Sequence, residues 1–242
     1  MTRSKEKIND AFWNEYFRSY DILNMVNAYR NLLETVASKI DIRAGDKVLD
    51  AGTGTGNLAV LLAREGARVY GIDSSSHGLK IFQEKIPQGK TILHDLGEPI
   101  PIADSYFDHI CCVNTLFALD HSKREAICKE FYRIMKPGGT IVMTNLLVGY
   151  KPVLIYAHHI RHHINSHGLL KTIWHIVSIL RPTLKMFYYN RLMQEKTIAT
   201  GDINFFKQGE QEDLLRRAGF REISQPEKIF ADQAVLNTAH KI

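Results

Sequence analysis

The sequence is short of cysteine and lacks any long apolar run. Among its 242 residues are three cysteines. Because they fall in an expected strand and an expected helix, they suit buried apolar positions rather than a disulfide framework. No window offers the roughly twenty uninterrupted apolar residues that a membrane-spanning helix needs. The polar start, MTRSKEKIND, lacks the apolar centre of a secretory signal peptide. These absences favour a cytoplasmic protein, either free or attached to a membrane surface.

Acidic residues are nearly absent from one segment of the chain. The formal net charge is +5, but between Leu146 and Thr200 seven lysines and arginines stand against a single acid, Glu195. That segment therefore carries +6 and leaves −1 for all other residues. No nucleic-acid recognition motif accompanies the basic residues, so we do not expect nucleic acid as a partner. The length suits a single α/β domain, residues 1–242, with the basic segment as an insertion.

The most informative stretch is KVLDAGTGTGNLA, residues 47–59. Its apolar start predicts a buried parallel strand that ends at Asp50. Three alternating glycines follow, namely Gly52, Gly54 and Gly56. Such glycines allow a sharp turn and let backbone amides approach a ligand where a Cβ atom would collide with it. The pattern predicts a site for a nucleotide-like cofactor.

This DxGxGxG pattern resembles the first motif of the class I S-adenosylmethionine-dependent methyltransferases, in which the turn holds the methionine part of the cofactor. The dinucleotide fingerprint GxGxxG does not fit, because Asn57 stands where its third glycine belongs. The resemblance implies S-adenosyl-L-methionine as the cofactor. It assigns cofactor contacts in this turn to Asp50, Gly52, Thr53, Gly54 and Gly56.

A second strand is expected over residues 67–73, with Asp73 at its end and Ser74 directly after it. A carboxylate about twenty residues beyond a glycine turn can accept protons from the ribose hydroxyls of a nucleotide. We therefore predict that Asp73 and Ser74 contact the cofactor. The alternative is that Asp73 serves as the N-cap of the helix starting near Ser76.

Three more cofactor contacts are expected at the ends of the next strands. After a strand at Lys90–Leu93, the resemblance assigns Asp95 to the adenine amino group and the backbone amide of Leu96 to an adenine ring nitrogen. Asn114 follows an expected strand at His109–Val113, which places it beside the cofactor. The alternative for Asn114 is the capping of the next turn.

Residues 131–145, FYRIMKPGGTIVMTN, carry a further match to the methyltransferase family: a helix end, a Lys-Pro-Gly-Gly turn and a strand. The resemblance covers about residues 45–145. It implies a Rossmann-like class I methyltransferase fold, with a mostly parallel seven-stranded sheet, helices on both faces and a helical cap inserted after strand five. Phe220–Ser224 and Ala234–His240 are the expected closing antiparallel strands.

Residues 1–40 are expected to form a helical lid ahead of the sheet, with helices near Ile8–Tyr20 and Leu23–Ile40. The segment YDILN, residues 20–24, resembles the YDxLN segment of the methyltransferases of ubiquinone and menaquinone biosynthesis. In methyltransferases of this kind an aromatic residue from this region covers the cofactor. That makes Tyr20 a further candidate for cofactor binding.

Residues 146–200 are expected to form a basic amphipathic helical cap. Its apolar helical stripe consists of Leu169, Leu170, Ile173, Ile176, Val177 and Leu180. The stripe could pack on the catalytic domain or on a second subunit of a homodimer. The cap could instead line a pocket for a hydrophobic or anionic molecule, with contacts from Tyr188, Tyr189 and Arg191, or attach to an anionic membrane surface.

Histidines offer two further candidates. His158 with His162, and His159 with His163, are four residues apart, a spacing that can hold a metal on one helix face. No glutamate accompanies them, so we favour a partly protonated basic face and expect no metal. His121 is the best-placed general base by sequence, but we favour its alternative role as an exposed residue of a helix cap. The catalytic residue therefore stays unassigned.

Together these observations predict a methyltransferase that uses S-adenosyl-L-methionine. In-line methyl displacement requires alignment of donor and acceptor and exclusion of water, but no covalent nucleophile. We expect a small, hydrophobic or lipid-like methyl acceptor, and the basic cap leaves peripheral membrane contact open as one of the alternatives above. The alternative is a catalytically silent, cofactor-binding adaptor whose basic cap holds a partner or a membrane surface.

Overall fold

The computed structural model describes residues 10–17, 20–200 and 204–242. Within them lies a seven-stranded sheet of order β3-β2-β1-β4-β5-β7-β6. The strands are β1 Lys47–Ala51, β2 Arg68–Asp73, β3 Lys90–Leu93, β4 Phe107–Val113, β5 Met135–Leu146, β6 Glu227–Ile229 and β7 Ala234–His240. Strands β1 to β5 pair in parallel, and β7 runs antiparallel to both β5 and β6. The expected mostly parallel sheet is confirmed.

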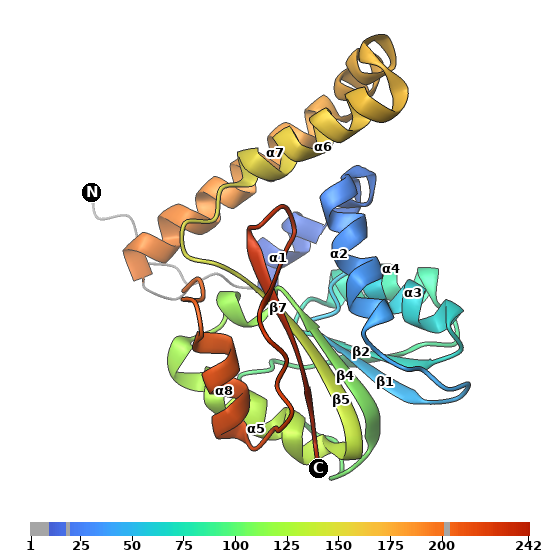
Figure 1. The fold of residues 1–242 in the computed structure, drawn as a ribbon, viewed down its shortest axis with the longest axis vertical. Coiled ribbons are helices and arrows are strands. Elements are labelled where there is room, and N and C mark those ends of the chain that lie inside the picture. Colours follow the sequence, from blue (N-terminus) through green and yellow to red (C-terminus); the bar gives the residue numbers. More distant parts are fainter. Residues whose placement is uncertain (1–9, 18–19, 201–203) are drawn as a thin grey trace.

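Helices cover both faces of this sheet, as expected (Figure 1). The α-helices are α1 Asp10–Phe17, α2 Asn27–Ser38, α3 Asn57–Arg64, α4 Ser76–Lys85, α5 Arg124–Ile134, α6 Pro152–His167, α7 Leu169–Thr200 and α8 Glu210–Ala218. Short 3-10 helices are η1 Tyr20–Met25, η2 Leu116–Ala118 and η3 His121–Lys123. Helices α2, α3 and α4 pack together on one face, and α5 packs with α8 on the other.

The central strands are apolar because both of their faces are covered. In β1, Val48 and Leu49 are fully buried, and in β4 the adjacent Cys111 and Cys112 are fully buried as free thiols. The third cysteine, Cys128 on α5, is also buried and free. The cysteines thus serve as small apolar core residues.

The Lys-Pro-Gly-Gly segment is a bulge within β5. Helix α5 ends at Ile134, and β5 begins at Met135 opposite Phe107 of β4. The next paired residues are Thr140 and His109, so the pairing advances by five residues on β5 and by two on β4. The extra residues form a bulge that re-aims the strand before it enters the core.

The expected strand at Phe220–Ser224 is wrong, because the closing strand β6 lies further along the chain at Glu227–Ile229. Within the predicted range, Arg221 makes one isolated bridge to His240, and Glu222 has a left-handed φ of 49° that interrupts an extended backbone. Phe220 is fully buried, with its ring 5.2 Å from that of Tyr132 on α5. Its apolar character therefore reflects packing against a helix.

Helices α6 and α7 form a hairpin that is inserted after β5 and extends away from the sheet (Figure 1). At its base, α6 packs on α2 and α7 packs on η1. Pro152 begins α6, where its missing N–H costs nothing, whereas Pro182 lies inside α7. Among the described helices, none is both long and apolar enough to cross a lipid bilayer.

Candidate active site

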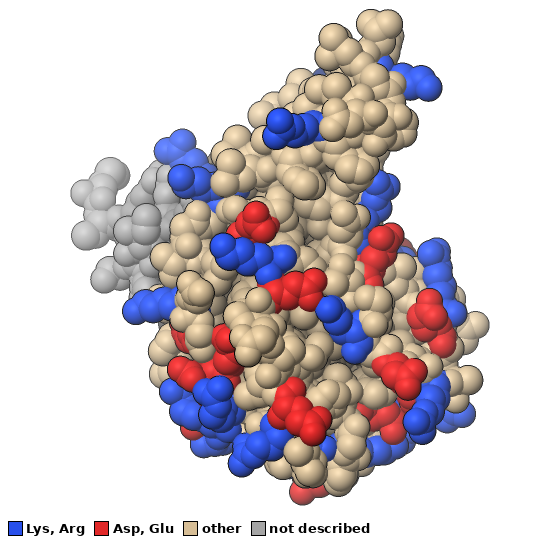
Figure 2. Space-filling view, in the orientation of Figure 1, with Lys and Arg blue, Asp and Glu red and all other residues tan. Residues whose placement is uncertain are grey.

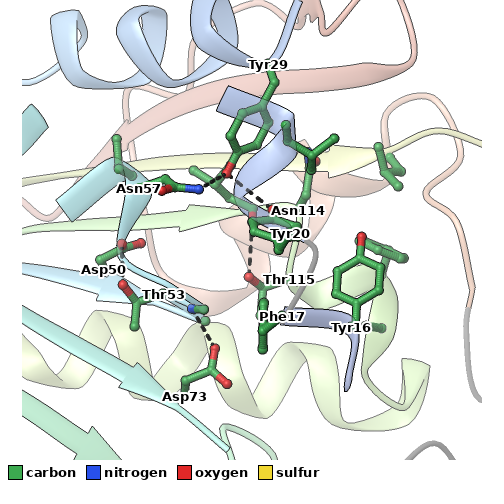
Figure 3. A pocket seen from close by; sticks show the side chains of 18 of the residues that line it. Tyr16, Phe17, Tyr20, Tyr29, Asp50, Thr53, Asn57, Asp73, Asn114 and Thr115 are labelled. Carbon is green, nitrogen blue, oxygen red and sulfur yellow. Dashed lines mark hydrogen bonds between the residues drawn. The ribbon is translucent and has the colours of Figure 1, made fainter. Parts of the chain in front are cut away.

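A cavity lies at the carboxyl ends of β1, β2 and β4, between the glycine turn, the N-terminal helices and the base of the α6–α7 hairpin (Figure 3). Ten of the predicted cofactor residues line it: Tyr20, Asp50, Gly52, Thr53, Gly54, Asp73, Ser74, Asp95, Leu96 and Asn114. The fold thus brings together side chains that are far apart in the sequence. Their contacts with a cofactor stay a prediction.

Gly56 is the predicted residue that lies outside the cavity lining. It precedes α3 with a left-handed φ of 77°. A Cβ atom built on it would come within 2.6 Å of the Phe82 ring on α4, and that ring is fully buried. The third glycine therefore permits the close packing of α4 on the turn. Sequence reasoning could not see this, because the neighbour of Gly56 comes from another helix.

Asp50 is a buried acid of the cavity whose pKa is raised. Only 3% of its surface is exposed, and its Oδ2 atom accepts a hydrogen bond from the Thr53 hydroxyl at 2.6 Å. Burial raises the pKa of Asp50 to about 7, and the nearby charge of Asp73 adds to the rise, whereas the hydrogen bond from Thr53 opposes it. A cation placed beside Asp50 would favour its ionised form.

Asp73 organises the glycine turn. Its Oδ2 atom accepts a hydrogen bond from the backbone N–H of Gly54, and its Oδ1 atom accepts one from Ser75, each at 2.8 Å. The N-cap of α4 is Ser75, whose hydroxyl accepts from the Gly78 N–H at 3.0 Å. The capping alternative for Asp73 is therefore wrong, although this carboxylate does order the residues on both sides of it.

The remaining predicted residues lie along the same edge of the sheet. Asp95 is exposed, and its Oδ1 atom accepts a hydrogen bond from the Gly97 N–H at 2.8 Å. Asn114 has a left-handed φ of 49°, and its backbone N–H donates to the Thr144 carbonyl at 2.8 Å. The cavity thus has carboxylates at three successive strand ends, where hydrogen-bond donors of a ligand can be accepted.

The YDILN segment holds the N-terminal helices over the glycine turn. Asp21 accepts a hydrogen bond from the Thr55 hydroxyl at 2.7 Å and forms an ion pair with Lys85 at 2.8 Å. Asn24 donates to the Asn57 side chain at 3.0 Å. The sequence analysis selected Tyr20 from this segment and missed the contacts of Asp21 and Asn24. Both residues belong to the YDxLN motif, which could have indicated their role.

Aromatic rings from these helices form one wall of the cavity (Figure 3). The hydroxyl of Tyr29 on α2 donates to that of Tyr20 at 3.3 Å, and the ring of Tyr20 packs against those of Tyr16 and Phe17, with each pair of ring centres 5.4 Å apart. These rings thus form an apolar side of the cavity opposite the hairpin.

The opposite half of the cavity comes from the loop after β5 and from the hairpin. Its lining residues are Tyr150, Pro152, Ile155, Tyr156, Met186 and Asn190. The predicted pocket contacts Tyr188, Tyr189 and Arg191 do not line it. Tyr188 is 59% exposed, and Tyr189 packs its ring on those of Phe12 and Tyr16. Met186 and Asn190 lie on the side of α7 that faces the cavity, whereas the predicted contacts lie on its other sides.

The histidines lie outside the cavity, apart from His94 at its rim. His121 does not line the cavity. Its side chain is 63% exposed and lies 3.3 Å from a Glu210 oxygen, so it is not placed to act as a general base there. His159 and His163 share a cluster with His175 of α7. Within the described residues, no group of three or more metal-ligating side chains is arranged to hold a metal ion.

Sequence comparison decides the family. A family model described as a methyltransferase domain matches residues 48–139, the stretch that holds the glycine turn and the first four strands. A demethylmenaquinone methyltransferase of Chlorobaculum parvum is 32% identical over 164 residues, which cover 64% of this chain and 66% of that protein. The chain belongs to the class I S-adenosylmethionine-dependent methyltransferases. The cofactor of this methyltransferase is S-adenosyl-L-methionine.

Two further similarities agree with this assignment. A demethylmenaquinone methyltransferase of a Geobacillus species is 27% identical over 171 residues, which cover 64% of this chain and 72% of that protein. The solved structure of an S-adenosylmethionine-dependent methyltransferase from Thermotoga maritima superposes with a TM-score of 0.61 at 22% identity, covering 96% of this chain and 98% of that chain. The family model matches residues 48–139, whereas the structural similarity in fold covers 96% of this chain.

The residues present fit this cofactor chemically. S-adenosyl-L-methionine carries an ammonium group, two ribose hydroxyls and an adenine amino group, all of which donate hydrogen bonds. The cavity offers the carboxylates of Asp50, Asp73 and Asp95, which accept them. The buried Asp50 is suited to the ammonium group, since a nearby cation offsets the desolvation of a carboxylate.

Proposed function

We propose that this methyltransferase transfers a methyl group from S-adenosyl-L-methionine to a small, hydrophobic or lipid-like acceptor. The observation that carries the proposal is the half of the cavity formed by the hairpin base and the loop after β5. Its lining, from Tyr150 to Asn190, is aromatic, aliphatic or uncharged polar, with no charged side chain among the described residues. A phosphorylated or ammonium-bearing acceptor would find no counter-charge there.

The cofactor supplies an activated methyl group on a sulfonium, and the chain's own residues align the reactants. In this proposal Asp50 holds the ammonium end, Asp73 and Ser74 the ribose, and Asp95 with the Leu96 amide the adenine. The aromatic wall of α1 and η1 and the base of the hairpin then act as lid and cap, which exclude water while the acceptor approaches the methyl group in line.

A buried hydroxyl in the acceptor half can position a polar atom of an otherwise apolar acceptor. The Tyr156 hydroxyl is buried, Tyr156 lines the cavity, and the Thr183 hydroxyl lies near enough to lower the pKa of Tyr156. Burial raises the pKa of Tyr156, so this group acts as a neutral donor rather than a base. The names of the two relatives denote a quinone acceptor, and a ring with one polar oxygen and an alkyl chain matches such a lining.

The test is an acceptor panel with the purified chain and isotopically labelled S-adenosyl-L-methionine, read out as S-adenosylhomocysteine and methylated product by mass spectrometry. We expect turnover with alkylated phenols and hydroquinones, and kcat/KM that rises with alkyl length. Phosphorylated amines and free amino acids should remain unmethylated. Turnover confined to charged acceptors would overturn the proposal, and so would cofactor binding without turnover on any acceptor, the result expected of an adaptor.

A matched pair of variants on α7 locates the acceptor. Met186 lines the cavity and is 1% exposed, whereas Leu184 lies two residues away and is 58% exposed. Met186→Gln should raise the acceptor KM about tenfold with little change in cofactor affinity, because it places a polar amide in an apolar lining. Leu184→Gln should change neither quantity. Equal effects of the two substitutions would place the acceptor elsewhere.

A further inference from the structure

Helix α7 presents a long apolar stripe to solvent. Its residues are Leu169, Leu170, Ile173, Trp174, Val177, Leu180, Leu184 and Tyr188, and each is at least 47% exposed. Helical spacing of three and four residues places them on one side of the helix. The opposite side holds the buried residues Thr172, Ile179 and Met186, which face the rest of the protein. We call the eight exposed residues the outer face of the hairpin.

This outer face differs from the expected packing of the cap on the catalytic domain. Of the six stripe residues predicted from sequence, five are exposed and belong to the outer face, and Ile176 is partly buried. An exposed apolar patch of this extent, with Trp174 77% exposed near the hairpin tip, marks a surface that another phase or molecule covers.

The charge around the outer face has one sign. The sequence between Lys151 and Leu192 contains no aspartate or glutamate, and its cations are Lys151, Arg161, Lys171, Arg181, Lys185 and Arg191. Over the distal part of the hairpin, Figure 2 shows lysine and arginine side chains but no acidic ones. On α7, Lys171, Arg181 and Lys185 fall beside the apolar stripe by helical spacing.

We propose that the outer face docks on an anionic lipid bilayer, with α7 lying in the plane of the interface. Apolar and aromatic side chains then enter the boundary between headgroups and acyl chains, while the flanking cations meet lipid phosphates. Tryptophan at such a boundary is favourable because its ring is apolar and its N–H is polar. This inference deepens the proposed function, since it rests on a lipid-like acceptor that resides in the same bilayer.

A bilayer fits this surface better than a second copy of the chain does. Two outer faces in contact would bring together two sets of cations with no acid between Lys151 and Leu192 on either side to neutralise them. Like charges brought together at an interface are repulsive. Anionic lipid supplies the missing counter-charge, and its acyl region covers the exposed leucines and Trp174.

The hairpin also connects the bilayer to the cavity. Met186 and Asn190 line the cavity from the same helix whose outer face begins at Leu169. The rise of an α-helix places Met186 about 26 Å from Leu169 along the axis. Docking along α7 therefore brings the acceptor half of the cavity close to the lipid surface, and an acceptor can enter without crossing a long aqueous path.

The test is co-sedimentation of the full chain with phosphatidylcholine vesicles, prepared with and without phosphatidylglycerol, in the absence of cofactor and acceptor. We expect binding to the anionic vesicles, weakened by salt, and little binding to the neutral ones. In a Trp13→Phe background the emission of Trp174 should shift to the blue on binding, because its indole leaves water. Absence of binding, or equal binding to both vesicle types, would overturn the proposal.

Two sets of variants sharpen the test. Leu170→Ser with Trp174→Ser removes apolar anchors, and Lys171→Gln with Lys185→Gln removes two charges and should lower binding to anionic vesicles by about fivefold per charge. The controls are Leu93→Ser and Lys80→Gln, at exposed positions outside the hairpin. Both control variants should bind vesicles like the parent chain. Equal losses in the controls would contradict the assignment of the outer face.

Turnover separates this proposal from the proposed function. The outer-face variants should methylate a short-chain, water-soluble acceptor at the parent rate, because the outer face does not line the cavity. Vesicle binding without any methylation would sink the proposed function and leave the surface assignment standing. A dimer in light scattering that the outer-face variants abolish, with no vesicle binding, would assign the surface to a second copy instead.

Discussion

The carboxylate of Asp21 accepts a hydrogen bond from the Thr55 hydroxyl at 2.7 Å, which ties the N-terminal segment to the glycine turn. Thr55 is fully buried, so loss of its acceptor leaves a hydroxyl without a partner inside the glycine turn. Asp21 also pairs with Lys85, but both side chains are partly exposed, and that ion pair adds little. The buried hydrogen bond is the contact that matters for the turn.

Asp21→Ala should therefore weaken binding of S-adenosyl-L-methionine by about fivefold although Asp21 does not line the cavity. An unsatisfied buried hydroxyl costs about 1 kcal/mol, and the loosened turn loses that much of its preorganisation. Isothermal titration calorimetry measures the affinity. Glu34→Ala, at an exposed position of α2, is the matched control and should bind like the parent chain. Equal affinities for parent and Asp21→Ala would show that the segment does not order the turn.

Cofactor affinity should depend on pH through Asp50. Burial raises the pKa of this carboxyl to about 7, so below neutral pH it is mostly protonated and attracts the cofactor's ammonium group weakly. Affinity should rise by up to about tenfold per pH unit below pH 7 and level off above it. Calorimetry across this range measures the slope. Asp50→Asn should bind more weakly and lose this slope, and a slope retained in the variant would assign the titration to another group.

Gly56→Ala should destabilise the fold and spare the cofactor contacts. The new Cβ atom would lie 2.6 Å from the buried Phe82 ring, and alanine disfavours the left-handed φ of 77°. We expect a loss of roughly 2 to 4 kcal/mol in the free energy of unfolding, measured by urea denaturation. Gly209→Ala is the control, because Gly209 is also left-handed, with a φ of 82°, but has no atom within 4 Å of its Cβ position. Its smaller loss isolates the backbone cost, and equal losses would show that Phe82 accommodates the methyl group.

Much of the fold was predictable because local residues determine it. Buried parallel strands need continuous apolar runs, and those near Val48 and Ile110 were assigned correctly. The glycine turn and the acids at the strand ends depend on residues adjacent in sequence, and ten of the eleven predicted cofactor residues line one cavity. Their spacing carried the information, since the carboxyl ends of neighbouring parallel strands meet at one edge of the sheet.

The misses share a physical cause, which is that they depend on partners from distant segments. Phe220 suited a strand by its apolar neighbours, but it packs on Tyr132 of α5. The apolar stripe of α7 suited burial, yet Trp174 and its neighbours are exposed while Thr172 is buried. Periodicity identifies the faces of a helix but not which face meets the protein.

The histidine cluster at the hairpin base predicts a pH-dependent stability. The Nε2 atoms of His159 and His175 lie 2.8 Å apart, so a single proton must lie between them. The Asn27 N–H donates to Nδ1 of His159 at 3.2 Å, which keeps that atom unprotonated and places the shared proton on Nε2 of His159. Both ring nitrogens of His159 are therefore engaged in hydrogen bonds, and neither is free to accept a second proton. Burial lowers the pKa of His159 to about 4, and the surrounding cationic and imidazole groups add to the fall, namely His175, His163, Arg30 and His162.

The folded state therefore binds fewer protons at His159 than the unfolded state between pH 6.5 and about 4. The free energy of unfolding should rise with pH across this window, and acidification should weaken the packing of the hairpin on α2. Thermal unfolding at a series of pH values measures this slope, to which other groups contribute as well. His159→Gln removes the titrating imidazole and should flatten the profile by up to one proton. Parallel profiles for the parent and His159→Gln would show that the cluster does not couple protonation to hairpin packing.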